Sequence, residues 1–202
     1  HGGSGNCIYA LESSFNEHPY ITVEDCSFTN NRASFMGYER GGAIYAHTLS
    51  LQFAGTNTFT NNEASPEYVE PGQTPGSLGG SIFIAQAVPG EYRIPNLIIK
   101  NSYSAGYGGA IHIFAGDAEG KDDPKPSSLF ITLENCKFEN CSAGAQGGAI
   151  RMGDPQINNP DDTKDNDINV SGCSFIECKA PEGGALYFMD GDAEGDEETI
   201  VE

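Results

Sequence analysis

Tryptophan is absent from this 202-residue chain, and basic residues are scarce. Lys and Arg total 10 against 29 Asp and Glu, so the formal net charge is −19. A nucleic-acid-binding protein needs a basic surface to neutralise phosphates, and anionic membrane surfaces repel so acidic a chain. No apolar run reaches the roughly 18 residues of a membrane-spanning helix. We therefore expect neither nucleic-acid binding nor membrane insertion by this segment.

Helical periodicity is the second missing feature, since no segment places apolar residues three and four positions apart. Hydrophobic residues make up a modest 38% of the chain, whereas glycine is abundant at 26 residues. This composition is typical of a thin core with many corners. It favours an all-β fold over a helical one.

A Gly-Gly corner recurs down the chain, each time followed by a small residue and then Ile or Leu. Successive corners are separated by 38, 29, 39 and 36 residues, and repeats at such intervals indicate solenoids or propellers. Two adjacent glycines permit a positive φ and close approach of the backbone at a corner. The five pairs are Gly41-Gly42, Gly79-Gly80, Gly108-Gly109, Gly147-Gly148 and Gly183-Gly184.

A phenylalanine turn runs in phase with the glycine corners. Short β-type runs precede this turn. In the third repeat, its nearest equivalent is the stretch from Ile98 to Asn101. An Asn inside such a turn can hydrogen-bond the backbone of neighbouring coils and form a ladder. The four copies are Phe28-Thr29-Asn30-Asn31, Phe59-Thr60-Asn61-Asn62, Phe138-Glu139-Asn140-Cys141 and Phe175-Ile176-Glu177-Cys178.

Each unit therefore consists of a strand, a phenylalanine turn, a glycine corner and a second strand, without a helix. Such units stack as a parallel β-helix, here of about six coils within one domain over residues 1–202. The first and last repeats look open rather than capped by polar residues. We expect a segment of a longer solenoid, or a subunit that assembles head to tail.

The paired motifs resemble the FxxN and GGA[ILV] repeats of the polymorphic outer-membrane proteins of chlamydiae. The resemblance covers nearly the whole chain, although Cys141 and Cys178 replace the family's Asn. It implies a right-handed β-helix passenger that is exported to the cell surface and acts as an adhesin. An extracellular or cell-surface location is therefore expected.

Acidic residues concentrate in the stretches 117–123, 154–167 and 190–198, each of which follows a Gly-Gly strand. Corresponding loops of successive coils project from the same side of a solenoid. The acidic stretches therefore predict an acidic edge along that side. That edge is either a solvated surface or a site for calcium or a basic partner. The best calcium candidates are Asp190, Asp192 and Glu194, whose oxygens alternate around a glycine bend as at the start of an EF-hand. No other cofactor is expected.

Four of the six cysteines form two Cys-x4-Cys runs, Cys136 with Cys141 and Cys173 with Cys178. Their offset of 37 residues predicts that Cys136 stacks on Cys173 and Cys141 on Cys178. Adjacent strands place Cα atoms about 4.8 Å apart, within the disulfide range of about 4.4–6.8 Å. The alternatives are pairing within each run, or buried free thiols that act as small apolar fillers.

Two glycosylation acceptor patterns occur, at Asn140 and Asn169. Asn140 lies in a turn motif that favours Asn for structural reasons. Asn169 alternates with Ile168 and Val170, so we expect it to point outward and to be the better acceptor.

Three functions are compatible with these observations. The first is a non-enzymatic surface protein with a structural or adhesive role, whose loops contact a protein or glycan ligand. The second is a segment of an extracellular filament built by end-to-end stacking, because unpaired strand edges invite pairing. The third, a polysaccharide-acting enzyme, is disfavoured because the strands carry no clustered pair of carboxylates on neighbouring coils.

Overall fold

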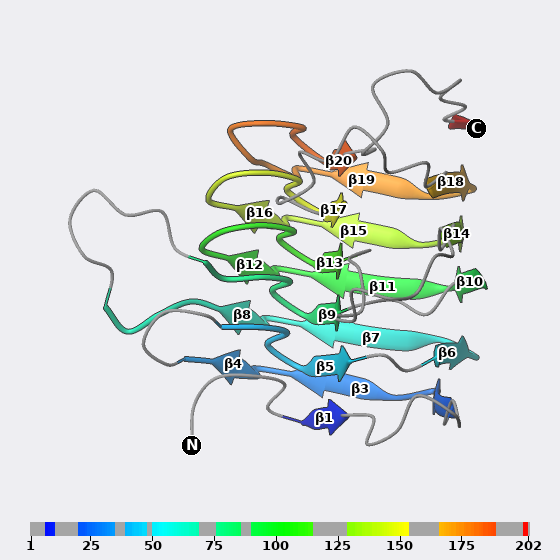
Figure 1. Ribbon diagram of the computed structural model, residues 1–202, viewed down its shortest axis with the longest axis horizontal. Coiled ribbons are helices and arrows are strands. Elements are labelled where there is room, and N and C mark those ends of the chain that lie inside the picture. The colour runs from blue at the N-terminus through cyan, green and yellow to red at the C-terminus, as the bar shows by residue number, and fades with distance from the viewer. Residues whose placement is uncertain are drawn as a thin grey trace, which may run out of the picture.

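The computed structural model describes residues 7–10, 20–34, 39–47, 50–68, 76–85, 90–114, 129–153, 166–188 and 200–201. All regular structure in this part of the chain is β, and every strand pairs in parallel with its counterpart one repeat away (Figure 1). The strands stack as a β-solenoid, as the repeats predict. The right-handed winding and the number of about six coils stay predictions.

The largest sheet contains the strands that follow the glycine corners. Its pairing aligns Ile8 with Ile44, Ile44 with Ile82 and Ile111 with Ile150, so that one inward position is apolar throughout. Its members in order are β1 (Ile8–Ala10), β5 (Ile44–His47), β9 (Ile82–Ala85), β13 (Ile111–Phe114), β17 (Ile150–Met152) and β20 (Leu186–Phe188).

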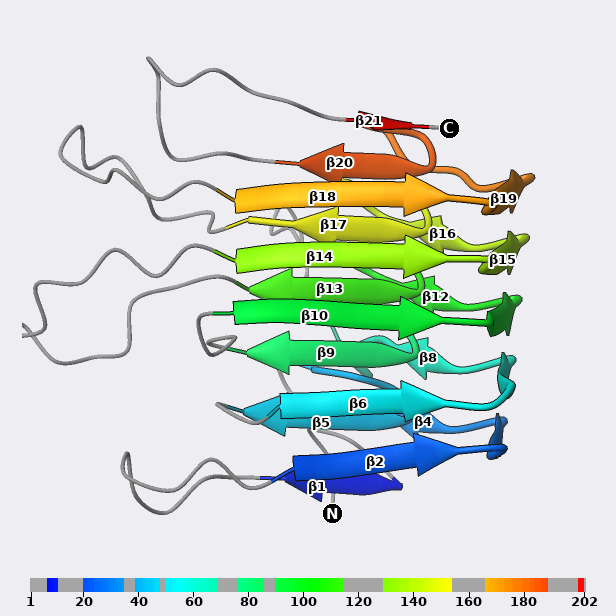
Figure 2. The same cartoon turned by 90° about the vertical axis from the view of Figure 1, so that its right-hand side faces the viewer.

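Opposite this sheet run the longer strands that enter each phenylalanine turn, in the reverse direction (Figure 2). Two of them form a separate pair, β2 (Tyr20–Glu24) and β6 (Ser50–Ala54). The other four are β10 (Gly90–Pro95), β14 (Leu129–Glu134), β18 (Asn166–Ser171) and β21 (Ile200–Val201).

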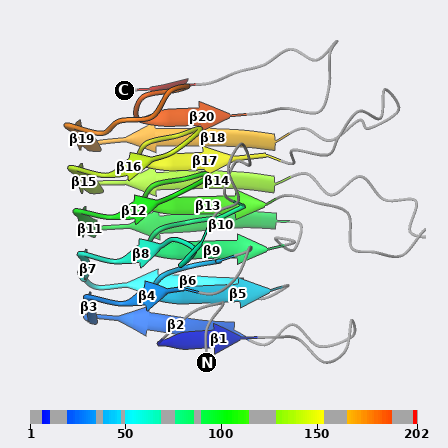
Figure 3. The same ribbon diagram turned by 90° about the vertical axis from the view of Figure 1, so that its left-hand side faces the viewer.

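Two further sheets complete each coil at the side (Figure 3). The phenylalanine turns form one of them: β3 (Ser27–Thr29), β7 (Asn57–Thr60), β11 (Leu97–Lys100), β15 (Lys137–Glu139) and β19 (Ser174–Ile176). The short strands before the glycine corners form the other: β4 (Arg32–Ala33), β8 (Glu63–Ala64), β12 (Tyr103–Ser104) and β16 (Ser142–Ala143).

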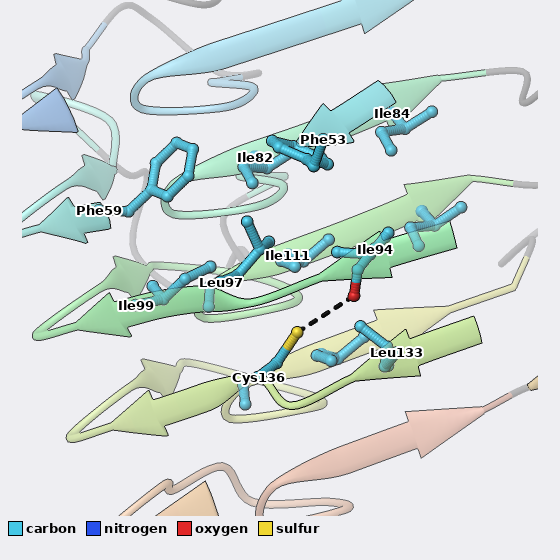
Figure 4. Close-up of a cluster of buried hydrophobic side chains, with 14 of the residues drawn as sticks. Phe53, Phe59, Ile82, Ile84, Ile94, Leu97, Ile99, Ile111, Leu133 and Cys136 are labelled. Atoms are coloured by element: carbon cyan, nitrogen blue, oxygen red, sulfur yellow. Dashed lines mark hydrogen bonds between the residues drawn. The ribbon is translucent and has the colours of Figure 1, made fainter. Parts of the chain in front are cut away.

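The core lies between the opposed sheets and is filled by stacked copies of the same side chains (Figure 4). The rings of Phe28 and Phe59 stack with centroids 4.7 Å apart, and those of Phe138 and Phe175 with centroids 5.0 Å apart. Strand alternation produces this arrangement, because every second residue points inward. Leu97 and Ile99 are fully buried for this reason.

The third repeat corrects the alignment that started its turn at Ile98. Ile99, not Ile98, pairs with Phe59, so Ser102 rather than Asn101 occupies the fourth position of the motif. Two consecutive isoleucines left the register open, and a shift of one residue exchanges the inner and outer faces of a strand.

The two glycines of a corner are required for different structural reasons. Gly108 adopts a φ of +63°, a left-handed conformation that favours glycine. A Cβ on Gly109 would instead collide with the carbonyl groups of Gly148 and Ser142. The second glycine therefore permits neighbouring coils to approach closely.

Candidate functional site

The outer face of the six-stranded sheet carries a column of stacked side chains, one from each strand. Its ring centroids are 5.0 Å apart between Tyr9 and Tyr45, and 5.4 Å apart both between Tyr45 and Phe83 and between Phe83 and His112. We call this set the outer column. Its members are Tyr9, Tyr45, Phe83, His112, Arg151 and Tyr187.

A second column comes from the residues immediately before each glycine corner and lies against the outer column. The chain changes direction at the corner, so side chains that precede the corner contact side chains that follow it. The guanidinium of Arg40 lies 5.5 Å from the ring centroid of Phe83, and that of Arg151 lies 4.9 Å from the ring of Tyr107. The second column consists of Arg40, Leu78, Tyr107, Gln146 and Glu182.

Arg151 and His112 form the polar centre of this face, and both are fully buried. Arg151 Nη1 donates to His112 Nε2 at 3.2 Å and to the carbonyl oxygen of Gly153 at 3.0 Å, while its Nε donates to Gln146 Oε1 at 3.0 Å. Since guanidinium can only donate, the imidazole must accept through Nε2 and carry its proton on Nδ1.

Burial lowers the pKa of His112 well below its ordinary value, and the nearby charges of Arg151 and Arg40 lower it further. The ring is therefore neutral at physiological pH. The hydrogen on its Nδ1 has no partner among the described residues. An enclosed neutral imidazole stacked on Phe83 stabilises the contact between coils, and it is not accessible to a substrate in this conformation.

Two further columns occupy the corners on either side of the phenylalanine turns, with side chains directed into the solenoid. The strand register places their members one above another. The first corner column consists of Cys26, Asn57, Leu97, Cys136 and Cys173. The second corner column consists of Asn31, Asn62, Ser102, Cys141 and Cys178.

Asparagine in these columns connects one coil to the next. Asn57 Oδ1 accepts the N–H of Cys26 at 2.9 Å, and Asn57 Nδ2 donates to the carbonyl oxygens of Val23 at 3.0 Å and Ala54 at 2.9 Å. The side chain is completely buried. It thus satisfies backbone groups at a corner, where the sheet hydrogen bonds are interrupted.

Asn62 has the same role in the second corner column. Its Oδ1 accepts the N–H of Asn31 at 3.0 Å and Asn31 Nδ2 at 2.9 Å. Its Nδ2 donates to the carbonyl oxygen of Phe28 at 3.1 Å and to Ser81 Oγ at 3.3 Å. Buried amides therefore link the early coils at both corners.

Cysteine takes over these positions in the later coils. Cys173 Sγ accepts the N–H of Cys136 at 3.3 Å and lies 3.6 Å from the carbonyl oxygen of Leu133, the counterpart of the contact between Asn57 and Val23. In the second column Cys178 Sγ contacts the carbonyl oxygen of Phe138 at 3.8 Å. The thiol copies the geometry of the amide with longer and weaker hydrogen bonds.

The paired thiols differ in acidity because a side-chain hydrogen bond within each pair favours the thiolate at the half-buried member and the thiol at the buried one. This bond lowers the pKa of Cys173 and of Cys178 to about 7. The same bond, together with burial, raises the pKa of Cys136 and Cys141. Cys173 and Cys178 are also the half-buried members of their pairs.

All six cysteines are free thiols in the structure. Cys136 and Cys173 face each other across neighbouring coils, as do Cys141 and Cys178, and a disulfide in either pair stays a prediction. Within the described residues, no group of three or more His, Cys, Asp or Glu side chains is placed to hold a metal ion. The calcium candidates Asp190, Asp192 and Glu194 lie outside these residues.

The two glycosylation candidates occupy different environments. Asn169 is exposed on the outward face of β18. Asn140 Nδ2 donates to Asn101 Oδ1 at 2.9 Å, within an outer row of asparagines that includes Asn61 and Asn30. A glycan on Asn140 would replace that hydrogen bond, whereas one on Asn169 would not. Glycosylation at either position stays a prediction.

Sequence reasoning missed the outer column, although a signal was available. Aligning the glycine corners places Tyr45, Phe83, His112, Arg151 and Tyr187 at the same position after each corner.

The acidic stretches after β13, β17 and β20 mostly lie outside the described residues. The strands β13, β17 and β20 that precede these stretches are parallel, so their C-terminal ends lie on the same side of the solenoid (Figure 2).

Comparison with known proteins matches residues 25–47 to the Chlamydia polymorphic membrane protein repeat. The match contains the first phenylalanine turn and the first glycine corner. Together with the β-solenoid, this match fits a repeat passenger of the polymorphic membrane protein type, a family whose own members are outer-membrane or surface proteins. No curated protein and no solved structure matches the chain. Among the described residues no helix has the length and apolar character needed to span a bilayer.

Proposed function

We propose that this chain is a non-enzymatic segment of a cell-surface protein, a solenoid with a structural and adhesive role. One observation carries the proposal: a repeat typical of surface proteins matches residues 25–47, and the same turn and corner recur in register along the solenoid. A surface location accounts for the acidic composition, because charge of one sign keeps a repeat protein soluble and monomeric.

The use of polar side chains supports a structural role. Asn57 and Asn62 bond to backbone groups of neighbouring coils, and the buried Arg151 spans adjacent strands of the outer column. Several partly exposed carboxylates form ion pairs with basic side chains. These pairs are Arg32 with Glu63, Arg93 with Glu134, and both Lys100 and Lys137 with Glu139.

The connections after β13 and β17 support an adhesive role. Each joins two strands held in continuous sheets, and binding residues commonly lie on loops that a rigid scaffold positions. Their composition is acidic, with Asp117, Glu119, Asp161 and Asp162 among their residues. The surface ligand that they suit is a protein or glycan with basic groups.

Two measurements test this proposal. Antibodies against the chain should label intact, non-permeabilised cells that make the protein. Beads coated with the folded chain should adhere to cells or matrix, and soluble chain should compete for that adhesion. In this adhesion assay, a variant in which Asp117, Glu119, Asp122 and Asp123 become Asn or Gln is compared with a control variant. The control carries substitutions at two exposed basic residues, Arg93→Gln and Lys179→Gln. Absence of surface labelling and of adhesion would rule the proposal out.

The non-enzymatic part of the proposal has its own test. A panel of polysaccharides is incubated with the chain, and the release of reducing sugar is measured. We expect no release above the level of a heat-denatured sample. Specific release that is abolished by substitution of a carboxylate would show that the solenoid is an enzyme instead.

One observation favours a filament as the alternative function. Inward side chains of the last described coil, among them Phe175, Leu186 and Phe188, are only partly buried, whereas Phe59 and Phe138 in the interior are fully buried. A further coil would cover them, from this chain or from another copy. Concentration-dependent sedimentation and periodic fibres in electron micrographs would support end-to-end stacking, and a monomer at all concentrations would exclude it.

A further inference from the structure

The cysteines of the later coils are placed as two matched pairs, one at each end of the paired strands β15 and β19. Ser174 N–H donates to the carbonyl oxygen of Cys136 at 2.9 Å, and Lys179 N–H donates to that of Cys141 at 2.9 Å. The same register that aligns Phe138 with Phe175 therefore holds each cysteine against its partner. We propose that the chain carries an oxidation site at which Cys136–Cys173 and Cys141–Cys178 disulfides fasten two adjacent coils.

Distance favours pairing between coils over pairing within one coil. Directly paired residues on neighbouring strands have Cα atoms about 4.8 Å apart, and disulfides join Cα atoms about 4.4–6.8 Å apart. Cys136 and Cys141 instead flank β15 in the same coil, in different corner columns. The three-residue strand Lys137–Glu139 between them alone spans about 10 Å, which is beyond the reach of a disulfide.

The contacts of the sulfur atoms agree with this pairing. Cys173 Sγ approaches the backbone N–H of Cys136, so the half-buried side chain points at the coil below. Cys178 Sγ reaches the carbonyl oxygen of Phe138 in that coil, and Phe138 lies three residues before Cys141. Both side chains thus already point toward the coil that contains the proposed partner.

The oxidant required is a disulfide compound, and the reaction has two exchange steps. The Cys173 thiolate attacks one sulfur of the oxidant, forms a mixed disulfide and releases the first thiolate. Cys136 then loses its proton and attacks the Cys173 sulfur, and the second thiolate of the oxidant leaves and takes up a proton. Two protein thiols are oxidised to one disulfide while one disulfide is reduced to two thiols. Cys178 and Cys141 follow the same course.

The two remaining described cysteines lack such partners. Cys7 Sγ donates to Asn31 Oδ1 at 2.8 Å, at the second corner column, whereas Cys26 belongs to the first corner column and lies against Asn57. The two columns are separated by a strand of the phenylalanine-turn sheet. We therefore expect Cys7 and Cys26 to form no disulfide within the chain when the two pairs oxidise, and at most to hold the oxidant as a mixed disulfide.

The pairing can be mapped directly. The folded chain is incubated with oxidised glutathione, free thiols are alkylated, and the protein is digested with trypsin and a glutamate-specific protease. Cleavage after Lys137 separates Cys136 from Cys141, and cleavage after Glu177 separates Cys173 from Cys178. Mass spectrometry should find peptides that join Cys136 to Cys173 and Cys141 to Cys178, with Cys7 and Cys26 either alkylated or bound to glutathione.

Variants give a second measurement. The oxidised chain should melt on the order of 5–10 °C above the reduced chain, because each disulfide closes a loop of 37 residues in the unfolded state. Cys173→Ser with Cys178→Ser should abolish this difference, and Cys7→Ser with Cys26→Ser should preserve it. Linked peptides within one Cys-x4-Cys run, a Cys7–Cys26 bond, or all six thiols free after oxidation would overturn the proposal.

Discussion

The early and late coils of the solenoid solve the same structural problem with different side chains. At both corners of the phenylalanine turn, the early coils use Asn57 and Asn62, whereas the late coils use cysteines. The backbone register is unchanged, since Phe28 pairs with Phe59 as Phe138 pairs with Phe175. Apart from Leu97 in the first corner column, these positions hold a small side chain that bonds to backbone groups of a neighbouring coil, and this side chain need not be an amide.

Packing differs between the same two regions. The phenylalanines of the early turns are buried, and a Cβ on Gly42 would collide with the carbonyl oxygens of Gly80 and Glu63. In the last described coil Phe175 is half-buried, and a Cβ on Gly184 would meet nothing within 4 Å. A glycine corner with neighbouring backbone close to its Cβ position is thus much less tolerant of added volume than one with open space there.

The largest expected effect comes from adding a methyl group at the second glycine of a corner. Gly42→Ala should lower the free energy of unfolding by about 3 kcal/mol, because backbone atoms must move to admit the Cβ. Gly184→Ala, the matched control, should change it by about 0.5 kcal/mol or less. Urea unfolding followed by circular dichroism measures both. Equal losses would show that the two ends do not differ in packing.

The next effect tests the amide against the thiol. Asn62→Ala should destabilise the chain by about 2–3 kcal/mol, because the N–H of Asn31 and the carbonyl oxygen of Phe28 lose their buried partner. Cys141→Ala under reducing conditions should cost about 1 kcal/mol, since the contacts of its thiol with backbone carbonyl oxygens are long, at 3.7 Å to Ile99 and 3.6 Å to Glu139. The same urea titrations compare them, and a larger loss for Cys141→Ala would contradict this ranking.

Repeated motifs made most of the fold predictable. The recurrence of Phe28 at Phe59 and of Ile44 at Ile82 fixes the register, because a parallel stack aligns equivalent residues. The third repeat was misaligned because Ile98 and Ile99 are both apolar. Asn96 supplies the missing signal: it adopts a positive φ of 54°, as its counterpart Asn135 does at 53°, and aligning the two places Ile99 at the phenylalanine position.

The burial of the outer column was beyond this kind of inference, although its alignment was not. His112 and Arg151 occupy outward positions of their strands, where polar side chains are ordinarily exposed. Their burial depends on side chains that precede the glycine corners, such as Tyr107 and Gln146. These side chains contact the outer column only because the chain changes direction at the glycine corner. Periodicity within a strand contains no information about that contact.

A smaller effect should follow from exchanging the two chemistries. Asn62→Cys, under reducing conditions, should cost about 1 kcal/mol less than Asn62→Ala, because a sulfur can still accept the N–H of Asn31 through a weak hydrogen bond. Thermal unfolding of the two variants and of the parent chain provides the measurement. If the cysteine variant is no more stable than the alanine variant, the late coils do not use their thiols as substitutes for the amide.

The smallest effect concerns reactivity and leaves stability unchanged. Since the pKa of Cys173 and of Cys178 is lowered to about 7, the thiolate fraction at each should rise from about a tenth at pH 6 to about nine tenths at pH 8. Alkylation by iodoacetamide, quantified by mass spectrometry of each peptide, should therefore accelerate roughly tenfold over this range and then level off. Cys136 and Cys141 should stay unlabelled throughout, because they are buried and their pKa is raised. Equal labelling of both members of a pair would contradict the difference in pKa between them.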